Sequence, residues 1–140
     1  MKKYFLVVLL LILSLVNLSF SGCQTNSIAK YYSNRENYVS ATGTITHIST
    51  NVEKKTIYIG FEDLSYPFDD TTFKIVGKNY DIVINNGILN SLKVGIQARF
   101  ISAPRYFGDG YVMPIVAIAI SGNTYLDFEE GFGNFYSMYS

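Results

Sequence analysis

The sequence predicts a mainly β domain, a five-stranded barrel with one helix between its third and fourth strands. Two patterns carry this prediction: apolar and polar residues alternate along several segments, and this alternation gives way once to helical spacing. Alternation is typical of strands with one buried face, and helical spacing is typical of an amphipathic helix. A third observation is Gly43 in the middle of the first alternating segment. A glycine inside a strand indicates a bulge or the sharp bend that barrel closure needs.

The first two expected strands form a hairpin. The first strand is predicted over residues 38–50, the polar turn over 51–55 and the second strand over 56–63. The inward face of the first strand is expected to carry Val39, Ala41, Gly43 and Ile45. The inward face of the second is expected to carry Ile57, Ile59 and Phe61.

A short third strand and a helix follow. Residues 64–70 contain Pro67 and are predicted to form a loop, and residues 71–76 the third strand. Apolar residues at helical spacing then predict a helix over residues 79–88. Asp81 suits its first turn, where the helix dipole favours an anion. Asn86 and Gly87 would supply a left-handed stop at its end, within that range.

The last part of the chain returns to strand patterns. Residues 93–103 alternate, and residues 111–121 are almost continuously apolar, which indicates a strand covered on both faces. Pro114 cannot donate to a ladder and indicates a bulge or an unpaired edge. A turn at residues 122–123 leads to a final edge strand at 125–128. The resulting order is that of an OB-fold, a five-stranded Greek-key barrel, with a β-sandwich or an open α+β sheet as the alternatives.

The amino terminus has the pattern of a secretory signal peptide over residues 1–22. A positive start is followed by an apolar run, shorter than the roughly 20 residues of a spanning helix, and then by Ser21 and Gly22 directly before Cys23. This resembles the lipobox of bacterial lipoproteins, with Phe20 in place of the usual leucine. The resemblance implies that Cys23 carries lipid on its sulfur and becomes the first mature residue. The alternatives are an uncleaved membrane anchor and a buried, inert thiol.

Removal of the signal changes the composition of the working chain. It leaves 118 residues, and because two lysines leave with it, 9 basic side chains face 11 acidic ones, a net charge of −2. We expect a polar tether over residues 23–37, the barrel over 38–130 and an aromatic-rich tail over 131–140, which packs on the barrel or serves as a recognition segment. A slightly acidic domain offers no electrostatic attraction to nucleic acid, so none is expected as a partner.

Three segments carry a resemblance to known proteins. Residues 39–48 and 92–100 are similar to the first and fourth strands of OB-fold proteins of the anticodon-binding-like type. Residues 105–116 resemble a stretch of small lipoproteins from Gram-positive bacteria. The likeness covers most of residues 38–130. It implies the fold and a location, exported and lipid-anchored to the bacterial cell membrane with the domain outside the cytoplasm, and it carries over no catalytic residue.

The one histidine and the acidic residues are the candidates for chemistry. His47 is predicted on the apolar face of the first strand, where a structural role is favoured over that of a general base or metal ligand. Acidic side chains bracket the loop at residues 64–68, namely Glu62, Asp63, Asp69 and Asp70. They favour a solvated loop, because their spacing does not match an EF-hand calcium site. The alternative is that two of these carboxylates act as the catalytic pair of a glycosidase. No metal or cofactor is expected.

The loop between the last two long strands is the candidate ligand site. A strand follows its Gly-Asp-Gly sequence, which indicates a hairpin turn rather than a phosphate loop. In an OB-fold this loop borders the ligand face. The candidate residues are Arg105, Tyr106, Phe107, Asp109 and Tyr111. Their rings would stack on a sugar or a base while Arg105 and Asp109 make polar contacts, or the rings cap the barrel.

These observations predict a membrane-anchored, non-enzymatic binding or scaffold module for an envelope glycan or protein. The alternatives are a small envelope hydrolase that uses Asp69, Asp70 or His47, and an OB domain that binds nucleic acid. The absence of clustered histidine and cysteine weighs against an enzyme.

Overall fold

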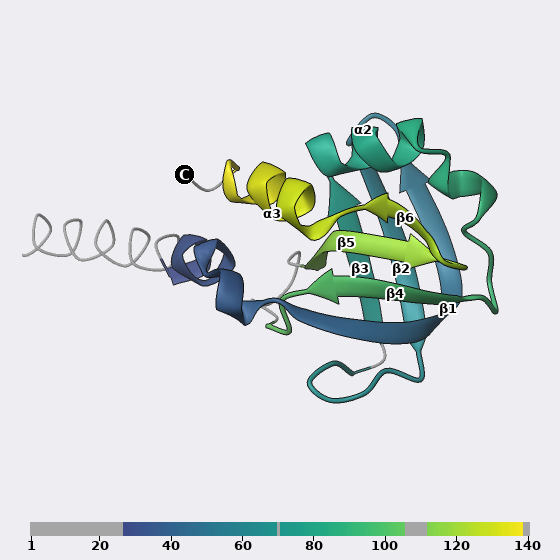
Figure 1. The fold of residues 1–140 in the computed structure, drawn as a ribbon, viewed down its shortest axis with the longest axis horizontal. Coiled ribbons are helices and arrows are strands. Elements are labelled where there is room, and N and C mark those ends of the chain that lie inside the picture. Colours follow the sequence, from purple (N-terminus) through teal and green to yellow (C-terminus); the bar gives the residue numbers. More distant parts are fainter. Residues whose placement is uncertain (1–26, 70, 106–111, 139–140) are drawn as a thin grey trace, which may run out of the picture. The chain divides into compact units, whose positions relative to one another are not determined.

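The computed structural model describes residues 27–69, 71–105 and 112–138. The chain divides into a first unit that ends at Tyr31 and a second that begins at Tyr32. Figure 1 shows the ribbon with the helices and strands of the second unit labelled. The described residues of the first unit, 27–31, are helical, and the helical conformation continues to Ser33. No helix within the described ranges is long and apolar enough to cross a membrane.

The second unit is built on a closed five-stranded barrel. The strands follow the order β3-β2-β1-β4-β5, and a short parallel pairing of β3 with β5 closes the sheet. The strands are β1 (Val39–Asn51), β2 (Thr56–Glu62), β3 (Thr71–Val76), β4 (Gln97–Ser102) and β5 (Met113–Ile120). Helix α2 (Lys78–Asn85) lies between β3 and β4 in the chain. This arrangement confirms the predicted OB-like barrel rather than a sandwich or an open sheet.

Strand β1 is shared between two neighbours, which is how the barrel closes. Its first half, from Val39 to Thr44, pairs with β4, and its second half, from Thr44 to Asn51, pairs with β2. Gly43 lies at this changeover. A Cβ atom there would stand 2.6 Å from the Leu64 side chain, so the absence of a side chain allows the close approach.

A bulge in β1 moves the histidine to the outside of the barrel. Ile45 pairs with Phe61 and His47 pairs with Gly60, which leaves Thr46 as the extra residue. A one-residue bulge shifts the alternation of side chains by one position. His47 is therefore exposed, and the prediction that it lies on the apolar face is wrong.

Strand β4 begins later than predicted. The apolar alternation from residue 93 continues into it, yet Gly95 has φ 87° and Val94 is 65% exposed. The Gly95 amide donates to the Ile45 carbonyl at 2.8 Å, and the Ile45 amide donates to the Ile96 carbonyl at 2.9 Å. These bonds hold a turn against β1, so the ladder with β1 starts at Gln97.

Strand β5 is buried along both faces, as its apolar run predicts. Its register with β4 shifts between Ala117 and Ile115, close to Pro114, which agrees with the predicted bulge. The Pro114 carbonyl accepts a hydrogen bond from the Ser102 hydroxyl at 2.6 Å, so its polar oxygen is satisfied in the interior.

Helix α2 ends where the sequence indicates. Asn86 is its C-cap, and Gly87 follows in the left-handed conformation with φ 78°. A short 3₁₀ helix, η2 (Ile88–Asn90), follows, and it contains Ile88, the last residue of the predicted helix. Asn86 also donates its side-chain amide to the Tyr125 carbonyl at 2.9 Å, which ties this end of α2 to the final strand.

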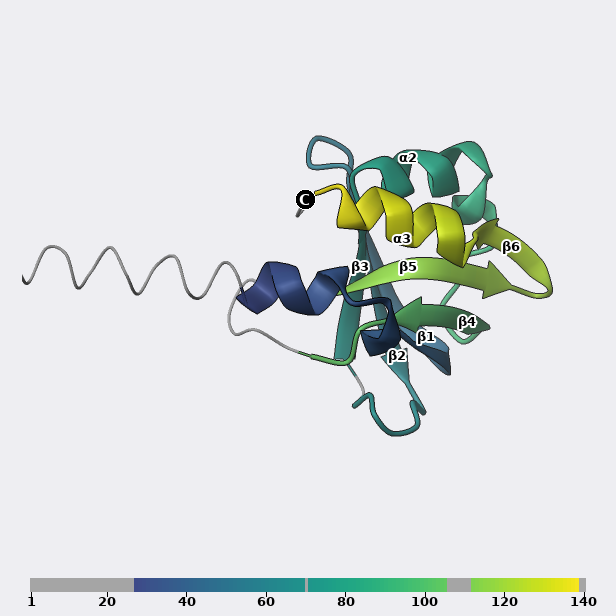
Figure 2. The same ribbon diagram turned by 60° about the vertical axis from the view of Figure 1, so that its left-hand side comes forward.

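Two elements follow the barrel. Ser121 and Gly122 both have positive φ and form a two-residue turn into the edge strand β6 (Asn123–Leu126), which lies two residues earlier than predicted. Helix α3 (Phe128–Tyr136) was not predicted, and it packs on β5 alongside α2 (Figure 2). Its Phe135 is buried at 3% exposure. The aromatic-rich end of the chain is thus helical over residues 131–136.

Four phenylalanine rings fill the centre of the barrel. Phe61 and Phe100 stack with their centroids 4.5 Å apart, and Phe73 lies 4.8 Å from Phe100. Phe68, from the loop after β2, contacts Phe73 at 5.5 Å. The loop is therefore fixed to the core through one ring, and the other three rings come from β2, β3 and β4.

Candidate binding face on strands β1, β2 and β3

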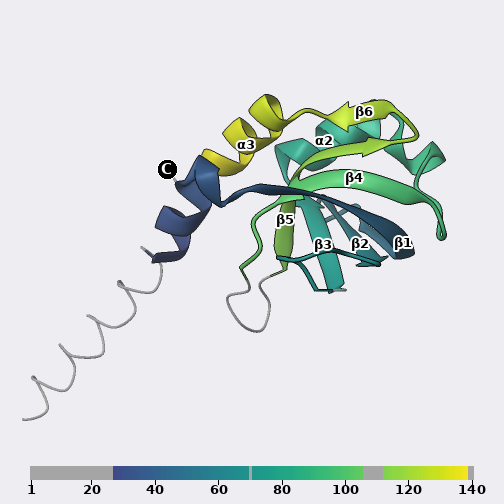
Figure 3. The same cartoon turned by 60° about the horizontal axis from the view of Figure 1, so that its bottom comes forward.

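Two rows of side chains cross the outer side of β1, β2 and β3, which lie side by side in the barrel wall (Figure 3). The strand register places His47, Gly60 and Thr72 in one row and Ser49, Tyr58 and Lys74 in the other. The rows are two residues apart along each strand, so both project to the same side. We call these six residues the outer face.

The His47 imidazole lies across Gly60. Its Nε2 is 3.1 Å from the Thr72 hydroxyl, and its Nδ1 is 3.3 Å from the Thr46 hydroxyl. A Cβ on Gly60 would stand 2.1 Å from two atoms of the ring. The absence of a side chain at Gly60 therefore creates the space for the ring, and the imidazole covers the centre of the first row.

The second row adds a phenol and an ammonium group. Tyr58 and Lys74 are both partly exposed and face each other across β2 and β3. Burial lowers the pKa of Lys74 below its ordinary value of 10.5, because the charged form loses hydration. Lys74 also pairs with Pro114 at the start of β5, so this row borders the connection between β4 and β5.

That connection contains the ligand residues predicted from the sequence. Arg105 is exposed, and its amide donates to the Ala103 carbonyl at 2.9 Å in the turn after β4. The other four predicted residues and the lipidation site lie outside the described residues, namely Tyr106, Phe107, Asp109, Tyr111 and Cys23. The sequence-based prediction named this loop, and it did not include Tyr58, Gly60 or Lys74. Tyrosine and lysine alternating with buried residues on paired strands were the signal available.

The predicted acidic residues do not form a common site where they are described. Glu62 and Asp69 are exposed, and Asp63 accepts a hydrogen bond from the Thr44 hydroxyl at 3.4 Å. Asp70 lies outside the described residues. Within those ranges, no group of three or more histidine, cysteine, aspartate or glutamate side chains could hold a metal ion.

A depression lies on another part of the barrel. It has a volume of about 270 Å³ and lies between β4, β5 and the start of α3. Arg99 is exposed beside the small side chains of Ala119 and Thr124, and its Nε donates to the Ser40 hydroxyl at 3.2 Å. Two rings belong to its lining, but Phe100 is buried and the Arg35 guanidinium already lies over Phe128. This depression therefore offers fewer free ring faces for stacking than the outer face.

Comparison with known proteins does not assign the chain to a family. No family model matches the chain, and no curated protein sequence matches it. Among solved structures, the chain is similar to one titled "Crystal structure of Ag(I)CusF", with 16% identity and a TM-score of 0.31 over 60% of this chain and 97% of that chain. This likeness is too weak to carry an argument. The fold assignment rests on the strand order and register of the barrel itself.

Proposed function

We propose that the chain is a lipid-anchored, non-enzymatic binding module of the bacterial cell envelope that presents its outer face to an envelope glycan or protein. The observation that carries this proposal is the position of the His47 ring. The ring lies over Gly60, which has no side chain, and between the hydroxyls of two threonines. OB-folds bind oligosaccharides and oligonucleotides on the face of their second and third strands, beside the loop between strands four and five. The outer face occupies that position.

A glycan fits the chemistry of this face. The Tyr58 ring can stack on the apolar side of a sugar, as can the rings predicted in the adjoining loop, and an aromatic ring combines an apolar body with a polar handle. Threonine hydroxyls and the His47 imidazole can exchange hydrogen bonds with sugar hydroxyls. The Lys74 ammonium favours a glycan that carries carboxylates.

Nucleic acid is the less favoured ligand of the same face. Phosphate contacts require several lysine or arginine side chains. The outer face contributes only Lys74, and the mature chain has 9 basic against 11 acidic side chains. An interaction that falls steeply with salt would revive this alternative.

Retention of the protein on envelope components tests the proposal. The purified mature chain is passed over insoluble cell-wall glycan and over immobilised envelope proteins. Tyr58→Ala should weaken retention about tenfold. A nucleobase stacked on an aromatic ring contributes about 1–3 kcal/mol, and we expect a sugar stacked on Tyr58 to contribute the lower part of this range. Tyr106→Ala combined with Tyr111→Ala tests the loop in the same way. Arg99→Ala is the matched control. Arg99 lines the depression between β4, β5 and α3, so this variant should leave retention unchanged. If the unaltered protein is retained neither on the glycan nor on the envelope proteins, the proposal is contradicted.

A further inference from the structure

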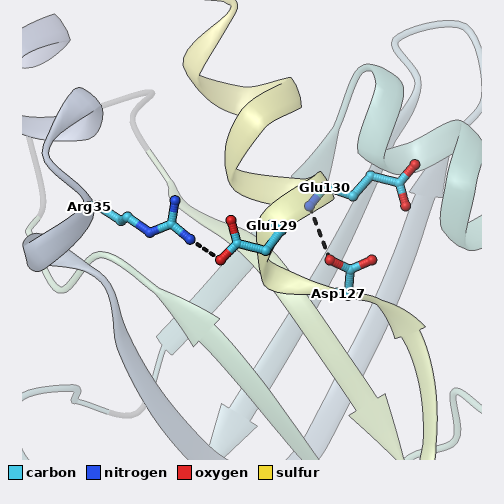
Figure 4. A network of polar contacts seen from close by, with 4 residues as sticks. All are labelled: Arg35, Asp127, Glu129 and Glu130. Atoms are coloured by element: carbon cyan, nitrogen blue, oxygen red, sulfur yellow. Dashed lines mark hydrogen bonds and ion pairs between the residues drawn. The ribbon is translucent and has the colours of Figure 1, made fainter.

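Aromatic rings and one arginine attach the start of the second unit to α3. Figure 4 shows the arginine, Arg35, extended toward Glu129 of α3. Arg35, in the short 3₁₀ helix η1 (Arg35–Asn37), forms an ion pair with Glu129. Its guanidinium lies 4.9 Å from the centroid of the Phe128 ring and 5.4 Å from that of Phe132. Such a guanidinium contributes both packing and a cation–π attraction to the rings.

Two tyrosines extend this attachment on both sides of Arg35. Tyr32 is 2% exposed and meets Phe135 edge to face, with ring centroids 5.3 Å apart. Tyr38 meets Phe132 edge to face at 5.3 Å and donates its hydroxyl to the Tyr32 carbonyl at 2.9 Å. The chain from Tyr32 to Tyr38 is therefore fixed to α3. The position of Tyr32 consequently determines the position of the C-terminal end of that helix.

The length of the chain limits how far α3 can lie from a lipid on Cys23. Tyr32 lies nine positions after Cys23 in the chain. A fully extended chain spans at most about 3.3–3.6 Å per residue, so this connection cannot exceed about 32 Å. This step rests on the proposed lipid anchor. With Cys23 acylated, the end of α3 that holds Tyr32 remains within that distance of the bilayer.

The C-terminal end of α3 has the composition of a membrane-contacting surface. Tyr136 is 43% exposed and stacks on Phe132, and Met138 is 56% exposed. Residues 131–138 carry no charged side chain, whereas the acidic residues of α3 stand in its first turn. Tyrosine is enriched where proteins meet the lipid headgroups, because its ring is apolar and its hydroxyl is wet.

We propose that the surface formed by Phe132, Tyr136 and Met138 rests in the headgroup region of the membrane to which Cys23 is anchored. Three side chains give weak membrane affinity by themselves, but the anchor keeps their effective concentration at the bilayer high. The contact needs no anionic lipid, because its three side chains are uncharged and the Arg35 guanidinium beside Phe132 is paired with Glu129. Its consequence is a fixed orientation of the barrel on the membrane instead of free rotation about the tether.

The absence of tryptophan from the sequence allows a direct test. Tyr136→Trp introduces a single tryptophan at an exposed position of the proposed contact. The lipidated chain is placed in phosphatidylcholine vesicles with and without brominated acyl chains, which quench nearby tryptophan. We expect the emission of Tyr136→Trp to shift to shorter wavelength and to lose most of its intensity with brominated lipid. Replacing part of the lipid with an anionic one should leave this quenching unchanged.

Val94→Trp is the matched control. Val94 is 65% exposed in the connection that leads into β4, away from the C-terminal end of α3 (Figures 1 and 2). We expect its emission to remain unquenched. If both variants stay on the vesicles and behave alike, the membrane contact of α3 is refuted while the anchor stands. If the unaltered chain is recovered free of vesicles, the lipid anchor is refuted. The membrane contact of α3, which depends on the anchor, is then refuted as well.

Discussion

A close approach between the backbones of α3 and β5 gives the sharpest prediction about stability. Gly131 lies in α3 against the Val116 carbonyl of β5, and a Cβ at Gly131 would stand 1.8 Å from that oxygen. Carbon atoms of this kind do not approach closer than 3.0 Å, so Gly131→Ala requires a movement of about 1.2 Å between helix and strand.

The loss of stability in Gly131→Ala arises from the buried contacts that this movement disturbs. The Gly131 carbonyl accepts a hydrogen bond from Asn79 at 2.8 Å, and Asn79 is 2% exposed. Leaving such a buried group unsatisfied costs about 1–3 kcal/mol, and overpacking costs a similar amount. Alanine returns about 1 kcal/mol through its higher helix propensity. We expect Gly131→Ala to lower the free energy of unfolding by about 3 kcal/mol, a large part of the roughly 5–15 kcal/mol of an ordinary domain.

Gly133→Ala is the matched control, because a Cβ at Gly133 meets no atom within 4 Å in the same helix. It should raise the free energy of unfolding by up to about 1 kcal/mol. Urea unfolding followed by far-ultraviolet circular dichroism measures both variants, and with m of about 1–3 kcal/mol/M the midpoint of Gly131→Ala should fall by about 1.5 M. A Gly131→Ala variant as stable as Gly133→Ala would refute the packing of α3 on β5.

Three further predictions concern the outer face and the anchor. Gly60→Ala should displace the His47 ring from the Thr72 hydroxyl, with a stability loss of about 1 kcal/mol, and unchanged imidazole NMR shifts would contradict this placement. Burial lowers the pKa of Lys74, so the unfolded chain binds this proton more tightly and the free energy of unfolding should rise with pH between the lowered value and 10.5. Urea unfolding over a pH series should show a shallower rise for Lys74→Met, and identical slopes would argue against burial of the ammonium. Cys23→Ala should abolish incorporation of labelled fatty acid, and undiminished labelling would exclude the lipid anchor.

The sequence predicted those parts of the fold that depend on local patterns. Alternation located the strands, with β3 at its observed bounds, and Gly87 marked the end of α2 by the conformation that glycine readily adopts. The element order then selected the barrel. These features were accessible because each depends on neighbours in the chain.

The remaining features depend on contacts between distant residues. The bulge at Thr46 reverses the side of His47, and nothing in the local pattern shows an extra residue in a ladder. Helix α3 contains Gly131 and Gly133, which disfavour a helix on propensity alone. Gly131 is tolerated because β5 requires a close backbone approach there.

The candidate site was predictable only in part for the same reason. The loop between β4 and β5 is recognisable from its glycines and aromatic rings. The outer face is assembled from three strands by their register, which aligns Tyr58 with Lys74 and His47 with Thr72. Register is a property of the assembled sheet, so the row that includes Lys74 could not be read from any one segment.

Mapping of amide NMR shifts during titration with soluble envelope glycan fragments tests the central claim most directly. The account predicts that the shifts concentrate on Ser49, Tyr58, Thr72 and Lys74, and on the adjoining Arg105. Shifts that gather around Arg99, or the absence of shifts with glycan and with envelope protein alike, would contradict it.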